Sequence, residues 1–579
     1  MSDTNNPETC ENKLGDVNMY FKLPIYYNKN KMSLKTNISN DLELVETTDS
    51  SYNSIYSHLF NTNNHELTNN IIQQISEYYT TDQVFLSENQ QFLREYKKEY
   101  DNDTDFKNII NIWNDIKGDT GFKEKYNYVD WSMFEFLNNS EYFLQIMSIY
   151  NMLSPVISFC VPAIILIIPF FIIKLKGLNL TVNEYIEILK LVAENHAVGK
   201  LFTKFNDVTT NEKIYFIVSA AFYLFTIYQN VLVCIRFNHN MIKIHKYLKI
   251  IQQYLKHTID KMNNYLLYSS NLTTHADFNN NLHDKIKILS IMRDKLTKIT
   301  EYKFTNCYKI FEIGHVLKCF YELYDSKIYN DVFMYSFGFN GYLMCIDGLL
   351  TNIENKKINF CNFVSNNKKT IFKNGYYAAL KDEKLVKNTV KLNKNLIITG
   401  TNASGKTTIL KSTLINLIFS QQFGCGCYES AKISPFKYIH CYLNIPDTCG
   451  RDSLFQAEAR RCKEIIDVIN ANKQDTHFCV FDELYSGTNP EEAVLSAKSF
   501  MEYVVKNKNV SCLLTTHFVK VCKKLKKNKD ILNCHMETFK NNNKITYSYS
   551  LKKGISEIKG GINVLCDMGY PREIIENTM

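Results

Sequence analysis

The sequence lacks the cysteine spacing of a metal-binding frame. Its 579 residues contain 17 cysteines, yet no two of them are spaced as C-x-x-C, and Cys425 and Cys427 are separated by only one residue. A zinc ribbon or zinc finger is therefore not indicated. Because the number of cysteines is odd, we expect reduced thiols in a cytosol-like compartment rather than a complete disulfide framework.

The N-terminus lacks the pattern of a cleaved signal, since "MSDTNNPETCENK" has no basic stretch followed by an apolar one. We expect residues 1–20 to form a disordered tail and residues 21–150 to be helical. Basic residues are scarce here: residues 1–150 hold 12 Lys and Arg against 23 Asp and Glu, whereas the remainder holds 55 against 36. An acidic front part does not suit binding to a phosphate backbone, and the basic remainder suits it better.

Charged residues are missing from two long stretches that follow. None occurs between Glu141 and Lys174, and the apolar runs 152–173 and 214–235 contain none. Each run has roughly the 20 residues that a helix needs to cross about 30 Å of hydrocarbon. We predict a transmembrane helical hairpin over residues 151–236, which would leave both flanking parts on the cytosolic side of a membrane.

The residues around these runs leave an alternative open. Arg236 and the lysines at 243, 246 and 249 fit a cytosolic flank, whereas the loop 174–213 between the runs contains six lysines. Pro162 and Pro169 would kink the first helix, which a membrane span tolerates. The alternative is a pair of fully buried core helices in a soluble protein.

Residues 237–369 are predicted to be helical. Apolar residues recur every three or four positions on both sides of the polar turn "SSNLTTHADFNNN", which indicates a helical hairpin over 237–300. This hairpin holds 10 Lys and Arg against 4 Asp and Glu. A solvated basic face and contact with DNA or lipid headgroups are both consistent with that charge.

The stretch "TGTNASGKTT" lies between a β-branched run, "NLIITG", and a helix-like segment. It fits G-x-x-x-x-G-K-[ST], in which glycines let successive backbone N–H groups face phosphate oxygens. Lys406 would place a cation at the β- and γ-phosphates, and the Thr407 hydroxyl would hold Mg²⁺. The following helix would direct its positive N-terminus at the phosphate. The predicted phosphate-binding residues are Gly400, Thr401, Asn402, Ala403, Ser404, Gly405, Lys406, Thr407 and Thr408.

Two further predicted strands end in polar residues. "HFCVFDELYSGT" runs into Asp482 and Glu483, which would lie beside the phosphate loop in a parallel sheet. Asp482 would bind Mg²⁺ through water, and Glu483 would polarise the attacking water. "VSCLLTTHF" runs into His517, which would sense the γ-phosphate. A solvated acidic turn and a histidine without function are the alternatives.

In their order along the chain, these segments resemble the ATPase domain of the MutS family of DNA mismatch-repair proteins. The order is "TGTNASGKTT", "GCGCYESAKIS", "GRDSLFQAEARR", "VFDELYSGTNPEEA", "TTHF" and "KGGINVLCDMGYPREIIE", within residues 370–579. The resemblance implies an α/β P-loop ATPase domain of the ABC type that uses ATP and Mg²⁺ and forms a homodimer. It also implies that residues 237–369 are lever-like helices and that Ser453 contacts the partner's nucleotide. The alternative for Ser453 is a helix N-cap.

The sequence departs from the family pattern at several positions. Thr401 stands where the family usually has proline, Ala403 and Ser404 replace Met-Gly, and Asn563 replaces a histidine that lies against adenine. The family's Arg-His-Pro is replaced by "NGYYAAL". Phe320 to Glu322 has the letters of the family's Phe-x-Glu wedge but lies in helical sequence, where packing is expected. No mismatch-recognition domain is identified.

Three functions follow from these features. The first hypothesis is an ATP-driven, DNA-binding protein related to mismatch repair and tethered to a membrane, with its ATPase domain facing the cytosol. The second is a membrane-anchored ATPase switch that acts on a protein or membrane partner and has lost mismatch recognition. A transporter subunit is disfavoured, because two spans are too few to form a pathway.

Overall fold

The computed structural model describes residues 16–49, 51–62, 65–98, 105–177, 181–195, 209–300, 311–365, 370–380, 385–443, 453–541, 544–556, 558, 569–571 and 573–574. The described residues form two compact units. Unit 1 comprises those within 101–260 and 286–333, and unit 2 comprises those within 15–100, 261–285 and 334–579. Unit 2 therefore combines the N-terminal segment with the C-terminal domain, whereas the sequence suggested a division in chain order.

Unit 1 is helical and has a core of aromatic rings. Trp113 stacks on Phe333 with ring centroids 4.2 Å apart, and Phe122 stacks on Tyr324 at 4.0 Å. Phe320 is fully buried against Phe122, so it packs in the core as expected. The elements that lie wholly in unit 1 are α6 (Phe106–Lys117), α7 (Phe122–Lys125), η2 (Glu135–Asn139), α8 (Glu141–Leu175), α9 (Val182–Asn195) and α13 (Ile313–Asp325).

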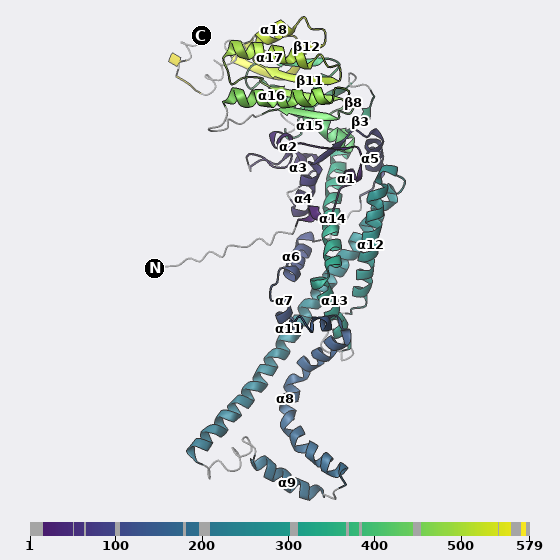
Figure 1. Ribbon diagram of the computed structural model, residues 1–579, viewed down its shortest axis with the longest axis vertical. Coiled ribbons are helices and arrows are strands. Elements are labelled where there is room, and N and C mark those ends of the chain that lie inside the picture. The colour runs from purple at the N-terminus through teal and green to yellow at the C-terminus, as the bar shows by residue number, and fades with distance from the viewer. Residues whose placement is uncertain are drawn as a thin grey trace. The chain divides into compact units, whose positions relative to one another are not determined.

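The two apolar runs lie in the long helices α8 and α11 (Figure 1). α8 continues through Pro162 and Pro169 as one helix, and α11 (Thr210–Ser269) extends far past the end of the second run. The hairpin predicted over 237–300 is present as the second half of α11 and α12 (Ala276–Thr297), and its repeating apolar positions are buried, among them Leu248, Leu255 and Leu282.

The N-terminal segment of unit 2 consists of short elements. Val17 is 1% exposed, so the disordered tail predicted over residues 1–20 extends too far towards its C-terminal end. A pair of short antiparallel strands, with Lys31 opposite Thr80, interrupts the helical region predicted over 21–150. The elements are η1 (Val17–Met19), α1 (Pro24–Tyr27), β1 (Lys31–Ser33), α2 (Thr36–Asp41), α3 (Ile55–Leu59), α4 (Glu66–Ile75), β2 (Tyr78–Thr80) and α5 (Gln83–Glu95), with η3 (Thr273–His275) from the α11–α12 connection.

Glycines in α14 (Lys327–Glu354) explain why this segment packs closely. A Cβ atom at Gly348 would lie 1.6 Å from the carbonyl oxygen of Phe60, and one at Gly338 would lie 2.3 Å from Cβ of Phe21. Only glycine permits backbone approach at this distance. The N-terminal segment is therefore packed against α14. Val17, which was assigned to the tail, is part of this contact, since its Cγ1 would lie 2.9 Å from a Cβ atom at Gly338.

The C-terminal part of unit 2 holds two sheets. In the larger sheet, of order β13-β12-β6-β11-β10-β9, only β13 is antiparallel to its neighbour; the smaller sheet has the order β5-β4-β8-β3-β7. β3 pairs with β7 and β8, so the domain begins before residue 370. The strands are β3 (Asn359–Phe363), β4 (Ile371–Gly375), β5 (Asn388–Lys391), β6 (Asn395–Thr399), β7 (Cys425–Gly426), β8 (Ser430–Ile433), β9 (Tyr438–Tyr442), β10 (His477–Asp482), β11 (Val510–Thr516), β12 (Ile531–Asn541) and β13 (Lys544–Lys553).

Four helices accompany these sheets (Figure 1): α15 (Lys406–Phe423), α16 (Leu454–Ala471), α17 (Pro490–Val504) and α18 (Val519–Leu525). α15 is buried along nearly its whole length, and its C-terminal end holds the N-terminal segment. The Gln422 amide donates to the carbonyls of Ile75 at 2.8 Å and Tyr78 at 2.9 Å, and it accepts from the Tyr56 hydroxyl at 2.9 Å. Because a buried amide requires partners, these bonds fix which backbone segments meet α15.

Candidate functional site

The loop between β6 and α15 has the backbone that a phosphate cradle needs. All five residues of β6 are buried, as expected of a strand with parallel neighbours on both sides. Ala403 and Gly405 have φ values of +60° and +90°, which turn the backbone sharply before α15 begins. The Ser404 hydroxyl donates to the carbonyl of Thr401 at 2.7 Å, and a Cβ atom at Gly400 would lie 2.6 Å from that hydroxyl oxygen. The loop is therefore closed upon itself.

Lys406 holds its ammonium group inside this loop. Its side chain is only 5% exposed, and Nζ donates to the carbonyl oxygens of Gly400 at 3.2 Å and Thr401 at 3.1 Å. Nζ also lies 4.0 Å from Oε1 of Glu483. Burial lowers the pKa of Lys406, and the carboxylates of Glu483 and Asp482 oppose that shift. A cation is thus positioned where the loop would receive an anion.

Thr407 and Asp482 form the second part of the site. The Thr407 hydroxyl donates to Oδ2 of Asp482 at 2.8 Å, and the Thr515 hydroxyl donates to Oδ1 of the same carboxylate. Asp482 lies at the end of β10, directly across from Thr515 of the parallel strand β11. Hydroxyl and carboxylate oxygens are the ligands that Mg²⁺ prefers, so this pair fits the ion expected with a nucleotide. Among the described residues, no group of three or more His, Cys, Asp and Glu side chains is arranged to hold another metal.

Glu483 and His517 form a close pair beside Lys406. Nε2 of His517 lies 2.6 Å from Oε1 of Glu483, whose backbone N–H donates to the carbonyl of Thr515 at 3.0 Å. The hydrogen bond from His517 lowers the pKa of Glu483 below its usual range, against the effect of burial. Glu483 has φ of +52°, a strained value for a residue with a side chain. The strained turn places the Glu483 carboxylate near the Lys406 ammonium.

These residues line an open pocket of about 850 Å³. Residues 402–409 and Glu483 form one part of its wall, while His517 lies in a neighbouring hollow of about 580 Å³ with residues 399–402. The sequence did not assign the tyrosines that complete the wall of the larger pocket. Tyr376 and Tyr377 come from the segment after β4, and Tyr547 and Tyr549 come from β13.

Tyr549 shows how the distant strand is fixed over the loop. Its φ is +54°, and its ring carbon would lie 3.2 Å from a Cβ atom placed on Gly405. The Asn388 side chain donates to the carbonyl of Tyr549 at 2.9 Å and accepts from the backbone N–H of Leu551 at 2.7 Å. The alternation in "TYSYS" is the sequence signal that places Tyr547 and Tyr549 on one face of a strand.

Ser453 is not among the residues that line this pocket. It caps α16: its hydroxyl accepts from the backbone N–H of Gln456 at 3.3 Å, and the Gln456 side chain accepts from the N–H of Ser453 at 2.9 Å. This is the N-cap alternative, and it leaves Ser453 exposed at the surface of its own chain. The contact with a partner's nucleotide stays a prediction.

Sequence reasoning missed Glu458, a buried acid of α16. Its carboxylate accepts from the backbone N–H groups of Ser486 at 3.1 Å and Gly487 at 3.2 Å and from the Ser486 hydroxyl at 2.9 Å. It therefore holds the turn that follows Glu483. The sequence shows Glu458 only as one acidic residue in the segment "GRDSLFQAEARR", and nothing in that segment indicates that it is buried. Asn563, expected near the adenine, lies outside the described residues.

The C-terminal part of the chain is similar to known proteins. Residues 396–579 match the family model for MutS domain V. The DNA mismatch repair protein MutS of Persephonella marina is 27% identical over 210 residues, which cover 35% of this chain and 24% of that protein. Msh3 of Dictyostelium discoideum is 28% identical over 217 residues (34% and 15%), and human MutS protein homolog 4 is 33% identical over 173 residues (28% and 18%). The chain thus spans about a quarter or less of the length of these relatives. The C-terminal part of the chain, residues 396–579, thus matches domain V of the MutS family.

Proposed function

We propose that this protein is a MutS-like ATPase that is tethered to a membrane and acts on duplex DNA, in mismatch repair or in recognition of DNA structure. Its C-terminal domain would be a P-loop ATPase domain of the ABC type that binds and hydrolyses ATP with Mg²⁺. One observation carries the ATPase assignment: the buried Lys406 ammonium, the Thr407–Asp482 pair and the Glu483–His517 pair come together at one loop. A cation, a hydroxyl–carboxylate pair and an oriented base are the groups that phosphoryl transfer to water requires.

Each of these residues has a distinct role in the proposed reaction. Lys406 would neutralise the β- and γ-phosphate oxygens with little rearrangement, since its ammonium already faces the loop. Thr407 and Asp482 would hold Mg²⁺, which neutralises charge on the transferred phosphoryl group when bound. Glu483 would orient the attacking water and accept its proton, and its lowered pKa keeps it ionised at neutral pH. His517 would position the Glu483 carboxylate and sense the γ-phosphate.

The exposed apolar helices support the membrane tether. Large side chains along both runs face outward, including Phe159 at 73% exposure, Phe171 at 58% and Phe222 at 67%. Core helices of a soluble protein would bury such side chains, each worth about 1.5–3 kcal/mol. The helices also contact each other, since the Tyr223 hydroxyl donates to the carbonyl of Ser158 at 3.1 Å. An antiparallel helix pair with polar contacts inside and apolar side chains outside fits a hydrocarbon environment.

Homodimer formation is the remaining part of the proposal. Ser453 is exposed at the N-terminus of α16, where four backbone N–H groups of a helix favour an anion. In a dimer of ATPase domains, this end of α16 would approach the nucleotide of the partner subunit. The family resemblance supports this contact.

The nature of the partner separates two versions of the proposal. The basic charge of residues 237–300 supports duplex DNA, whereas no mismatch-recognition domain was identified in the sequence. The alternative is a membrane-anchored ATPase switch that acts on a protein or membrane partner. It is favoured by the acidic residues 1–150, which hold 23 Asp and Glu against 12 Lys and Arg.

Two measurements on the full-length chain in detergent micelles test these assignments. Phosphate release should be stimulated by Mg²⁺ and be lost in Glu483→Gln, and absence of any release from the wild type would refute the ATPase assignment. Fluorescence anisotropy with a labelled duplex should show affinity that falls steeply between low and high salt. Undetectable binding at low salt would favour the alternative without DNA.

A separate test addresses the tether. The full-length chain should sediment with membranes and resist alkaline carbonate, because about 25 cal/mol per Å² of buried apolar surface holds each span. Deleting residues 152–235 should release a soluble protein that still binds ATP. Sγ of Cys234 lies 3.6 Å from the carbonyl oxygen of Met152, so the two ends of the deleted segment are close together. A short linker can therefore join the cut ends. A full-length chain that is soluble without detergent would reverse the assignment.

A further inference from the structure

A loop in unit 1 exposes several large apolar side chains close together in the sequence. Residues 129–138, called the aromatic loop here, expose large apolar side chains: Trp131 at 75%, Met133 at 72% and Phe136 at 66%. Scattered exposed apolar residues are normal on a protein surface. Three such side chains within six residues form a patch that requires an explanation.

Two polar residues of the aromatic loop, Glu135 and Asn138, are held by the protein, whereas Asp130 and Ser132 are exposed. Asn138 is 0% exposed, and its amide group accepts from the N–H of Val129 and donates to the carbonyl of Val129, both at 2.8 Å. Oε1 of Glu135 lies 2.6 Å from Nζ of Lys123 and accepts from the Tyr321 hydroxyl at 3.1 Å. Asn138 thus closes the loop at its base, and Glu135 fixes one side of it.

The residue just before the loop anchors it to the helical core. Tyr128 is buried, stacks on Phe122 with centroids 5.6 Å apart, and donates its hydroxyl to the carbonyl of Leu317 at 2.7 Å. Within the loop, the rings of Trp131 and Phe134 lie 6.4 Å apart. The outward direction of Trp131, Met133 and Phe136 therefore follows from a built scaffold.

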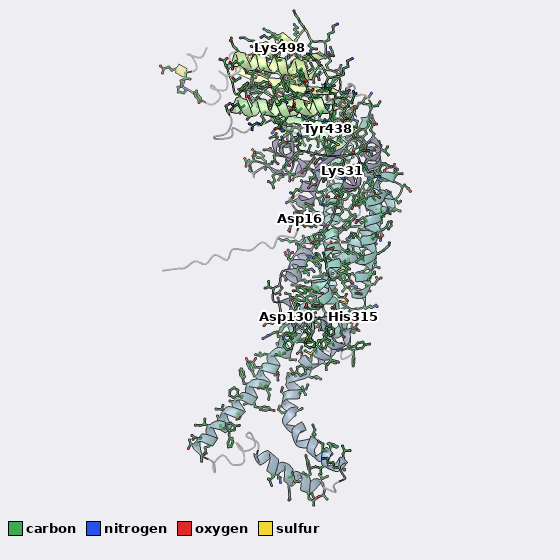
Figure 2. The ribbon with its side chains drawn as sticks, viewed as in Figure 1. Asp16, Lys31, Asp130, His315, Tyr438 and Lys498 are labelled. Carbon is green, nitrogen blue, oxygen red and sulfur yellow. The ribbon has the colours of Figure 1, made fainter. Side chains whose placement is uncertain are left out.

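The position of the loop in unit 1 indicates what covers it. The loop is followed by Ser140, the N-cap of α8, and the part of α8 without charged residues begins directly afterwards at Tyr142, which is 86% exposed. On the other helix, the Asn240 side chain donates to the carbonyl of Lys125 at 2.7 Å. Asn240 lies five residues beyond the second apolar run, which is roughly 7 Å along a helix. The headgroup layer is about 5–8 Å thick on each side of the hydrocarbon. Figure 2 labels Asp130 of this loop where α8 and α11 leave the rest of unit 1.

We infer that the aromatic loop inserts Trp131, Met133 and Phe136 into the headgroup layer of the leaflet that faces the ATPase domain. This inference rests on the proposed insertion of α8 and α11. Tryptophan and other amphipathic aromatic residues are enriched at this depth because they combine an apolar body with a polar edge. The loop would set the depth and tilt of unit 1 at the membrane surface, which two spans alone leave free to vary.

The chain carries a matched internal control for a test of this loop. It contains two tryptophans, and the other one, Trp113, is 2% exposed and stacked on Phe333. The full-length chain is reconstituted into phosphatidylcholine vesicles that carry bromine near the headgroup or near the chain terminus. Trp113→Phe leaves Trp131 as the only emitter, and Trp131→Phe leaves Trp113.

We expect bromine near the headgroup to quench the fluorescence of Trp113→Phe at least twofold more than that of Trp131→Phe. In Trp113→Phe, bromine near the headgroup should also quench more than bromine near the chain terminus. Carbonate resistance is measured on the same vesicles. Resistance without quenching of Trp131 would overturn the loop assignment while leaving the spans intact. If water-soluble acrylamide also failed to reach Trp131, a protein or a second copy of the chain would cover the loop instead. Quenching of Trp131 in a chain that carbonate extracts would support the loop assignment and refute the membrane spans. If Trp131 is not quenched and carbonate extracts the chain, both assignments are refuted.

Discussion

Replacing Lys406 by methionine tests the phosphate site most directly, because it removes the charge and keeps most of the side-chain volume. In the structure, Nζ is held by two loop carbonyls at 3.1 and 3.2 Å and is almost completely buried. A phosphate oxygen about 3 Å from this ammonium would interact with it by roughly 5 kcal/mol at an effective dielectric constant of about 20. Since 1.4 kcal/mol corresponds to a factor of ten, we expect nucleotide affinity to fall by about a thousandfold.

The same change should have the opposite effect on the protein without nucleotide. Burial lowers the pKa of Lys406, so the charged form is less favourable in the folded chain than in the unfolded chain. Below that pKa, Lys406→Met removes this cost, and the Tm of the free protein should stay constant or rise. The Tm increase on adding ATP should disappear, whereas saturating nucleotide stabilises the wild type by about 3–4 kcal/mol at a hundred to a thousand times Kd.

Thermal denaturation with and without ATP, together with direct titration of a fluorescent nucleotide, measures both effects. Lys411→Met is the matched control, because Lys411 lies on the same helix but does not line the pocket. A Lys406→Met protein that binds ATP as tightly as the wild type would refute the assignment of the loop. A variant that unfolds without ATP would instead show that Lys406 is structural.

Four further predictions concern individual residues. Glu483→Gln should retain ATP binding, slow phosphate release by about 10²–10⁴-fold and trap a dimer, as single-turnover kinetics and light scattering would show. His517→Gln removes the hydrogen bond that lowers the pKa of Glu483, so the acid limb of the kcat–pH profile should move to higher pH. Burial raises the pKa of Asp347 to about 6, so its stability penalty grows as the pH rises from the ordinary carboxyl range to about 6 and is constant above that. Asp347→Asn should therefore raise Tm at pH 7.5 more than at pH 5, and an equal rise at both values would contradict the assignment. Gly348→Ala should destabilise unit 2 by about 3 kcal/mol or more, because its Cβ would lie 1.6 Å from the Phe60 oxygen, while Gly121→Ala, whose nearest neighbour is 3.7 Å away, should be nearly neutral in chemical denaturation.

The turn between β6 and α15 and its acidic neighbour Asp482 were predictable because each is encoded within a few consecutive residues. A β-branched strand, a glycine turn and a Lys-Thr pair specify the cradle locally, and parallel strands bring Asp482 to its edge. The Glu483–His517 bond was less accessible to sequence reasoning, since its geometry depends on a strained backbone at Glu483. The pocket tyrosines were missed for a similar reason: Tyr549 reaches the loop only because β13 folds back beside β12.

The N-terminal segment was assigned to a separate helical region because its contacts leave no periodic signal. Gln421 donates to the carbonyl of Thr80 at 3.1 Å, and Gln90 donates to the carbonyls of Cys361 at 2.8 Å and Gly424 at 2.6 Å. These are single amide groups that satisfy backbone oxygens far away in the chain. Hydrophobic spacing predicts which face of a helix is buried, but it does not predict which distant segment covers that face.

These amide contacts also determine what can be cut from the chain. Near the end of α15, the Gln422 amide has its partners at Tyr56, Ile75 and Tyr78. The Gln421 amide donates to Thr80 in addition to its bonds with Phe436. A fragment beginning near residue 237 or 370 would remove these N-terminal partners. Each amide group left buried without a partner would lower the free energy of unfolding by about 1–3 kcal/mol. It would also uncover Phe419 and Phe423, which pack on Phe60 with centroids 5.6 and 5.4 Å apart. The N-terminal segment is therefore a structural part of the unit that carries the phosphate loop, and measurements of nucleotide or DNA binding require a chain that retains it.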